Sequence, residues 1–206
     1  IYIIILIGLA YSSLHAQKYL PPQILSVEEG LSSQQITSLT FDREGYLWTG
    51  TKYGLNRFDG YRFRHFLTST TGDGSVGNLT INIIREDGHG NLWILYDEGI
   101  NRYDHETGKM TRYPSTSFDT AYRNGSLLLD AYPGISGAVW ILSEESLTLL
   151  DIEQQTRSYR IPPEQLVNDV KPTCLLADAG GNVWIGTTGG LLLFNSQQGV
   201  FKELVV

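Results

Sequence analysis

The sequence predicts an all-β protein, a β-propeller made of four four-stranded antiparallel blades. Four tryptophans recur at spacings of 45, 47 and 44 residues, namely Trp48, Trp93, Trp140 and Trp184, and a glycine stands three residues before each of them. Repeats of about 40 to 50 residues that contain several short strands are typical of propeller blades. Because a single blade cannot bury both faces of its sheet, we expect successive repeats to stack on one another.

Each repeat is predicted to contain four strands joined by tight turns. In the first repeat, Ile36–Asp42 alternates apolar and polar residues as a half-buried strand does, and Gly45 gives the next turn its permissive backbone. The segments "YLWTGT", "LNRFD" and "YRFRHF" supply the other three strands, and the first strand should lie innermost. The third repeat is the least regular, because Gly134 replaces an aspartate that the other three share. The predicted blades, called blades one to four below, span residues 32–67, 78–113, 126–159 and 172–205.

The first sixteen residues are predicted to be a truncated secretory signal peptide, and residues 17–206 to be the partial propeller. The continuous apolar run "IYIIILIGLA" precedes "YSSLHAQ", a pattern typical of signal peptides that are cut after a small residue, here Ala16. An uncleaved membrane anchor is the alternative interpretation. The next segment, Pro22–Val27, is expected to form a strand that has no partner within its own blade.

Composition excludes several classes of protein. The net charge is −7 and no basic run occurs, so duplex nucleic acid and anionic membranes are poor partners for this chain. A hydrophobic fraction of 41% excludes a disordered chain. Cys174, the single cysteine, lies in an apolar strand and is expected to be buried as a small hydrophobic residue.

The chemistry-bearing residues predict binding rather than catalysis. The turn Asp87–Asn91 resembles a calcium loop, but a tight turn closed by hydrogen bonds to the Asp87 side chain fits its spacing better. We expect no metal site, no cofactor and no catalytic residue. The tryptophans recur at one strand position and should pack between blades. The candidate ligand contacts are polar or aromatic residues in or beside the loops between second and third strands: Tyr53, Tyr96, Asp97 and Glu98.

Two segments carry a resemblance to a known family. "SSQQITSLTFDREGYLWTGTKYGLNRFDG" and "AGGNVWIGTTGGLLLFN" resemble the two-component regulator propeller repeat, which occurs in the periplasmic sensor region of hybrid two-component systems of Bacteroidetes-type bacteria. The resemblance implies a ring of about seven blades, so that these four form an open arc of an incomplete ring. A small four-bladed ring that closes on itself is the alternative.

The same resemblance implies a function. Such sensors recognise an oligosaccharide and relay its presence to a histidine kinase on the same polypeptide, which is anchored in the inner membrane. This chain would then be an N-terminal, periplasmic segment without enzymatic activity of its own, partnered by the rest of the polypeptide and by a second copy in a homodimer. Two alternatives remain open: a secreted propeller enzyme acting on glycans, such as a lyase or glycosidase, and a protein-binding scaffold.

Overall fold

The computed structural model describes residues 24–67, 76–114, 128–134, 137–151, 153, 155–166 and 169–204. The predicted signal peptide, residues 1–16, lies outside these ranges. The described residues form four four-stranded antiparallel sheets, and the strand order within each sheet follows the chain. This confirms the predicted all-β architecture.

The first two sheets correspond to blades one and two. Their strands are β1 (Ile36–Phe41), β2 (Leu47–Thr51), β3 (Gly54–Phe58), β4 (Phe63–Phe66), β5 (Ile81–Glu86), β6 (Leu92–Tyr96), β7 (Gly99–Tyr103) and β8 (Met110–Pro114). The third and fourth sheets contain β9 (Leu128–Pro133), β10 (Val139–Ser143), β11 (Ser146–Leu150), β12 (Thr156–Arg160), β13 (Pro172–Ala177), β14 (Asn182–Thr187), β15 (Gly190–Asn195) and β16 (Val200–Leu204). Within the described ranges, 3-10 conformation occurs at Gly137 and in a single turn at Pro163–Gln165, and no helix is long and apolar enough to cross a membrane.

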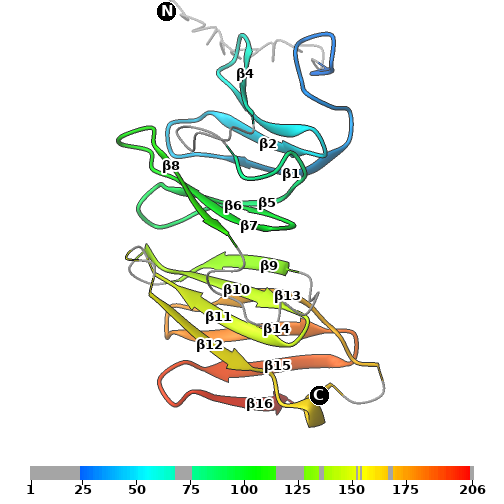
Figure 1. The fold of residues 1–206 in the computed structure, drawn as a ribbon, viewed down its shortest axis with the longest axis vertical. Coiled ribbons are helices and arrows are strands. Elements are labelled where there is room, and N and C mark those ends of the chain that lie inside the picture. The colour runs from blue at the N-terminus through cyan, green and yellow to red at the C-terminus, as the bar shows by residue number, and fades with distance from the viewer. Residues whose placement is uncertain are drawn as a thin grey trace, which may run out of the picture.

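The four sheets stack in chain order along the long axis of the molecule, with blade one at one end and blade four at the other (Figure 1). Consecutive first strands contact each other at every junction, β1 with β5, β5 with β9 and β9 with β13. The first strand is therefore innermost, as predicted. The blades form an open arc and do not close into a four-bladed ring.

The turns divide the arc into two faces. The turns Asp42–Tyr46, Asp87–Asn91 and Asp178–Asn182 join first to second strands at one end of the sheets, which we call the Asp-turn face. Because neighbouring strands are antiparallel, the turns between second and third strands lie at the other end, which we call the opposite face.

The Asp turns explain the recurrence of aspartate, glycine and tryptophan. In blade one, Asp42 Oδ1 accepts a hydrogen bond from Tyr46 N at 2.9 Å, and Asp42 Oδ2 accepts one from Trp48 Nε1 at 2.6 Å. Gly45 has a φ of 86°, in the left-handed region that favours glycine. The same pattern returns in blades two and four. The turn at Asp87 is thus the predicted hydrogen-bonded turn.

The charge of Asp178 should make blade four sensitive to acid. Hydrogen bonds from Trp184, Asn182 and backbone N–H groups lower the pKa of Asp178 from its usual 3.8 to about 2. Because the folded-state pKa is the lower one, the carboxylate stabilises the fold above about pH 4, and this stabilisation is lost as the pH falls through about 2. We expect Asp178→Asn to lower the melting temperature at about pH 6 and to change it less at about pH 2. Thermal unfolding followed by circular dichroism measures both differences, and equal differences would contradict the explanation.

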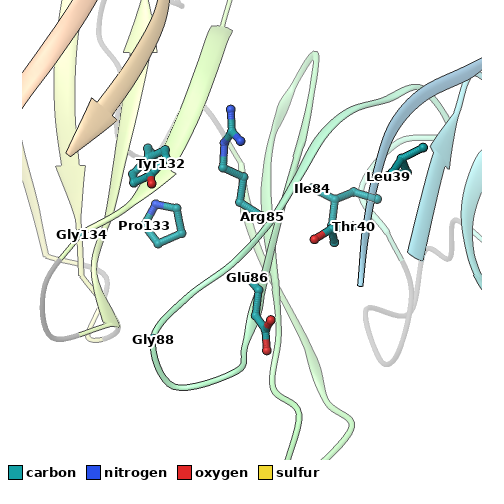
Figure 2. Close-up of a pocket in the computed structure, with 9 residues that line it drawn as sticks. All are labelled: Leu39, Thr40, Ile84, Arg85, Glu86, Gly88, Tyr132, Pro133 and Gly134. Atoms are coloured by element: carbon teal, nitrogen blue, oxygen red, sulfur yellow. The ribbon is translucent and has the colours of Figure 1, made fainter. Parts of the chain in front are cut away.

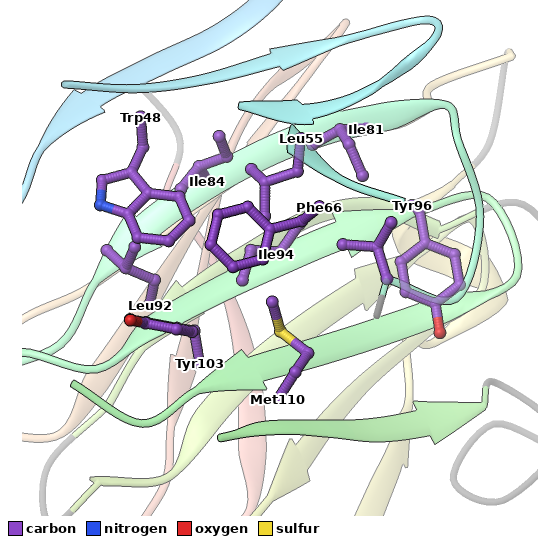
Figure 3. Packing of buried hydrophobic residues seen from close by; sticks show 11 residues of the cluster. Trp48, Leu55, Phe66, Ile81, Ile84, Leu92, Ile94, Tyr96, Tyr103 and Met110 are labelled. Atoms are coloured by element: carbon purple, nitrogen blue, oxygen red, sulfur yellow. The ribbon is translucent and has the colours of Figure 1, made fainter. Parts of the chain in front are cut away.

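The hydrophobic core consists of three clusters, one at each junction between blades. Trp48 packs between blades one and two, 4.9 Å from Tyr103 and 5.0 Å from Phe66 between ring centroids (Figure 3). Trp93 and Trp140 occupy the same position at the next two junctions. The predicted packing role is confirmed for these three tryptophans. No described residues form a blade on the outer side of Trp184, which is only half-buried.

An open end of the arc overturns the expected burial of Cys174. Cys174 is exposed rather than buried, because its position in β13 faces the flank where a fifth blade would pack. Within Pro22–Val27, the described residues Ile24–Val27 form no strand, and residues 22–23 lie outside the described ranges. Blade one presents a similar flank, on which Leu39 and Phe41 are 64% and 63% exposed.

Candidate functional site

The inner strands of blades one, two and three line an open pocket near the Asp-turn face. Its volume is about 410 Å³, within the range of small-molecule sites. We call it the inner pocket. Figure 2 shows its lining residues: Leu39, Thr40, Ile84, Arg85, Glu86, Gly88, Tyr132, Pro133 and Gly134.

Three residues of the inner pocket occupy the same position in their repeats but differ in chemistry. Thr40, Arg85 and Tyr132 each pair with the tryptophan of their own blade, so the three residues are equivalent. Leu176 has this position in blade four. The backbone of this position is the same in each blade, but the side chain is a hydroxyl in Thr40, a guanidinium in Arg85 and a phenol in Tyr132. Stacking of the blades therefore gathers three different side chains at one place.

Arg85 is fixed in the inner pocket by blade three. Its Nε donates to Ala131 O at 3.1 Å, and its Nη2 lies 3.5 Å from Asp130 Oδ1. The guanidinium carbon is 5.3 Å from the centroid of the Tyr132 ring, a cation–π distance, and Figure 2 shows Arg85 extending toward that ring. Asp130 is buried, and its Oδ2 also accepts a hydrogen bond from Leu175 N of blade four at 2.9 Å. The arginine side chain is thus held in one orientation.

The charges around the inner pocket are paired. Glu86 Oε1 accepts hydrogen bonds from Arg43 N at 3.0 Å and from Arg43 Nε at 3.4 Å. Arg85 is paired with Asp130. An aromatic ring, a hydroxyl and two charge pairs suit a neutral ligand that combines apolar faces with hydroxyl groups. Among the described residues, no three His, Cys, Asp or Glu side chains are placed to hold a metal ion.

The residues predicted as ligand contacts lie on the opposite face and not at the inner pocket. Tyr53 is 64% exposed in the β2–β3 turn, and Asp97 and Glu98 are exposed in the β6–β7 turn. Tyr96 is fully buried in the core between blades one and two, so its ring offers no surface to a ligand. Tyr96 therefore packs in the core, whereas Tyr53, Asp97 and Glu98 are open to solvent. The sequence signal for the inner pocket is the variable residue that pairs with each tryptophan.

The repeat chemistry agrees with a family comparison. The sequence profile described as "Two component regulator propeller" matches residues 30–53, which cover β1, β2 and the turn between them. Residues 30–53 therefore match one copy of the two-component regulator propeller repeat. The matched residues include the Asp turn at Asp42 and the packed Trp48, both described above. No curated protein shows significant sequence similarity to the chain.

Solved structures share the fold of this four-blade arc. The extracellular domain of a hybrid two-component system from Bacteroides thetaiotaomicron is 24% identical, with a TM-score of 0.59 over 87% of this chain and 31% of that one. An inactive virginiamycin B lyase from Staphylococcus aureus, with quinupristin, is 17% identical, with a TM-score of 0.63 over 82% of this chain and 54% of that one. The extracellular domain of a one-component system from B. thetaiotaomicron is 17% identical, with a TM-score of 0.51 over 85% and 30%. The chain therefore spans roughly a third to a half of these proteins, and the similarity establishes the fold.

Proposed function

We propose that the chain is part of the extracytoplasmic sensor region of a hybrid two-component system and that its ligand is an oligosaccharide. The regulator-propeller repeat at residues 30–53 supports the sensor role. The same fold in the extracellular domain of a B. thetaiotaomicron hybrid two-component system supports it as well.

The inner pocket is the observation that carries the ligand proposal. Sugars present apolar ring faces and hydroxyl edges, and sites for them combine an aromatic surface with a few fixed polar groups. Tyr132 supplies the ring, Arg85 supplies hydrogen-bond donors held in one orientation, and Thr40 supplies a hydroxyl. The volume of about 410 Å³ leaves room for more than a single small group.

Binding is favoured over catalysis because the carboxylate of the inner pocket is already engaged. A glycosidase needs two carboxyl groups about 5 to 10 Å apart on either side of the bond to be cleaved. Glu86 lines the pocket, but its Oε1 is bound by Arg43 through both backbone and side chain. Asp130 is buried beneath Arg85 and does not line the pocket. We therefore propose that this segment is not an enzyme.

The rest of the proposal concerns the whole protein. The chain would be exported to the periplasm, and the polypeptide would continue into further blades, an inner-membrane anchor and a histidine kinase. Further blades, to a total of about seven, would cover the apolar flanks that now expose Leu39 and Trp184. A homodimer of the full sensor completes the proposal.

The ligand proposal predicts selective binding that depends on Tyr132. The purified chain should bind members of an array of neutral oligosaccharides, and Tyr132→Ala should weaken that binding at least about 10-fold, which is the loss of roughly 1.4 kcal/mol of contact. Thr40→Trp, which narrows the same pocket, should act similarly if Tyr132→Ala proves unstable. Tyr61→Ala is the matched control, because Tyr61 is an exposed tyrosine that does not line the pocket.

Tyr53→Ala distinguishes the two faces of the arc. Loss of binding in this variant, with Tyr132→Ala unaffected, would move the site to the opposite face with Tyr53, Asp97 and Glu98. If the array shows no binding of any neutral oligosaccharide, the ligand proposal is wrong.

A further inference from the structure

A second, smaller cavity lies between blades three and four on the Asp-turn face. Its volume is about 190 Å³. Blade three supplies most of its wall and blade four contributes the rest. Its principal lining residues are Ala138, Trp140, Leu149, Arg157, Tyr159 and Ser196. We call it the ring pocket.

In blade one, two side chains fill the space that corresponds to the ring pocket of blade three. Tyr46 stands two residues before Trp48, and Arg57 pairs with Trp48 across the β2–β3 ladder. The guanidinium carbon of Arg57 lies 4.4 Å from the centroid of the Tyr46 ring and 5.7 Å from that of Trp48. An aromatic ring and a guanidinium thus occupy this position at the first junction.

Blade three lacks both of these side chains. Ala138 stands two residues before Trp140, and Leu149 pairs with Trp140 across the β10–β11 ladder. The pair Tyr46 and Arg57 is therefore replaced by Ala138 and Leu149, which are smaller and uncharged. The repeated backbone keeps the walls of the space, so removal of the ring leaves the ring pocket behind.

The size of the ring pocket matches one six-membered ring. An apolar cavity of about 150 Å³ in another protein accepts benzene. At about 190 Å³, the ring pocket can hold one ring with a small substituent. Trp140 is 5% exposed and Tyr159 is half-buried, so the pocket walls are aromatic and already packed.

The charge at the mouth of the ring pocket is positive. Arg157 is exposed in β12, and within the described part of the chain it takes part in no ion pair. Its neighbour Arg160, by contrast, lies 3.4 Å from Glu145. A planar guanidinium binds a carboxylate through two parallel hydrogen bonds. The ring pocket thus combines a space for a ring with an exposed arginine.

We propose that the ring pocket binds a six-membered ring that carries a carboxylate, with the ring in the space that Tyr46 fills in blade one and the carboxylate on Arg157. Two sources share this chemistry: the terminal uronic acid of an oligosaccharide and a small aromatic acid. The proposal stands independently of the inner pocket, because it uses different residues at a different junction.

Isothermal titration of the purified chain with two acids and their neutral counterparts tests the proposal. Methyl glucuronide and benzoate are the acids, and methyl glucoside and benzyl alcohol are the neutral probes. At least one acid should bind with a Kd of about 1 mM, and its neutral counterpart should bind about 10-fold more weakly. Tighter binding of methyl glucuronide indicates a uronic acid as the ligand, and tighter binding of benzoate indicates a small aromatic acid. If neither acid binds more tightly than its neutral counterpart, the proposal is overturned.

Variants separate this site from non-specific binding. Arg157→Gln should raise the Kd at least about 10-fold, whereas Arg160→Gln in the same strand should leave it unchanged. Ala138→Tyr restores the blade-one side chain and should abolish binding while the melting temperature is kept. If that variant does not fold, Leu149→Arg restores the other half of the blade-one pair and should have the same effect. Binding that is insensitive to Arg157→Gln overturns the proposal, and oligosaccharide binding at the inner pocket is unaffected by either result.

Discussion

Replacement of Trp93 by alanine is expected to lower the free energy of unfolding by about 3 to 5 kcal/mol, the usual cost of removing a large buried aromatic side chain. Trp93 is 1% exposed in the core between blades two and three, and its ring lies 5.8 Å from that of Tyr113. The variant leaves a cavity at a junction and also removes the hydrogen bond from Trp93 Nε1 to Asp87. Chemical denaturation monitored by circular dichroism measures the loss.

Trp184→Ala is the matched control for this experiment. Trp184 occupies the same repeat position and makes the same hydrogen bond to its aspartate, but it is half-buried on the open flank of blade four. We expect a clearly smaller loss than for Trp93→Ala, about 1 to 2 kcal/mol, because less apolar surface is removed from contact. Equal losses for the two variants would contradict the conclusion that the following blade provides the stabilisation.

Removal of the Asp130 carboxylate is expected to cost about 3 kcal/mol, since the variant Asp130→Ala breaks a buried charge pair by removing one partner. Asp130 belongs to blade three, contacts Arg85 of blade two and accepts a hydrogen bond from Leu175 N of blade four. The variant leaves the Leu175 N–H without its acceptor and Arg85 without its counter-charge. Three blades therefore lose a shared contact at once.

A double-mutant cycle separates the ion pair from the backbone hydrogen bond. The coupling between Asp130→Ala and Arg85→Ala, measured by denaturation, reports the Arg85 contact alone. Glu86→Gln is the control for an exposed pair and should cost less than about 1 kcal/mol, because water competes for the Arg43 contact. If Asp130→Ala costs no more than Glu86→Gln, Asp130 does not join the blades in the way described.

Much of the fold was predictable because its determinants are local. The aspartate, glycine and tryptophan of a repeat stabilise a single turn between two neighbouring strands. In blade one, Asp42 accepts hydrogen bonds from Tyr46 N and Trp48 Nε1. Such contacts span six residues or fewer, so they leave a period that can be read along the chain. Gly134, in place of the shared aspartate, likewise indicates from the sequence that blade three departs from the repeat.

Burial is harder to predict, because it depends on neighbours that are distant in sequence. Tyr96 lies beside a variable loop, and it is buried in a cluster that residues of blades one and two form together. Cys174 lies in an apolar strand and was predicted to be buried, yet it is exposed because no described residues cover its flank. Alternating apolar residues predict which face of a sheet is apolar, but they do not predict whether a neighbouring blade covers that face.

The sequence by itself determined the repeat, the four strands of each blade, the hydrogen-bonded Asp turns and the packing role of the tryptophans. The positions of the two pockets, by contrast, depend on how the blades stack. Thr40, Arg85 and Tyr132 lie about one repeat apart in the chain and meet because the blades stack with their first strands together. The ring pocket similarly depends on which side chains a junction lacks. A repeated backbone sets where each side chain points, and the stacking of different blades decides which of these side chains meet.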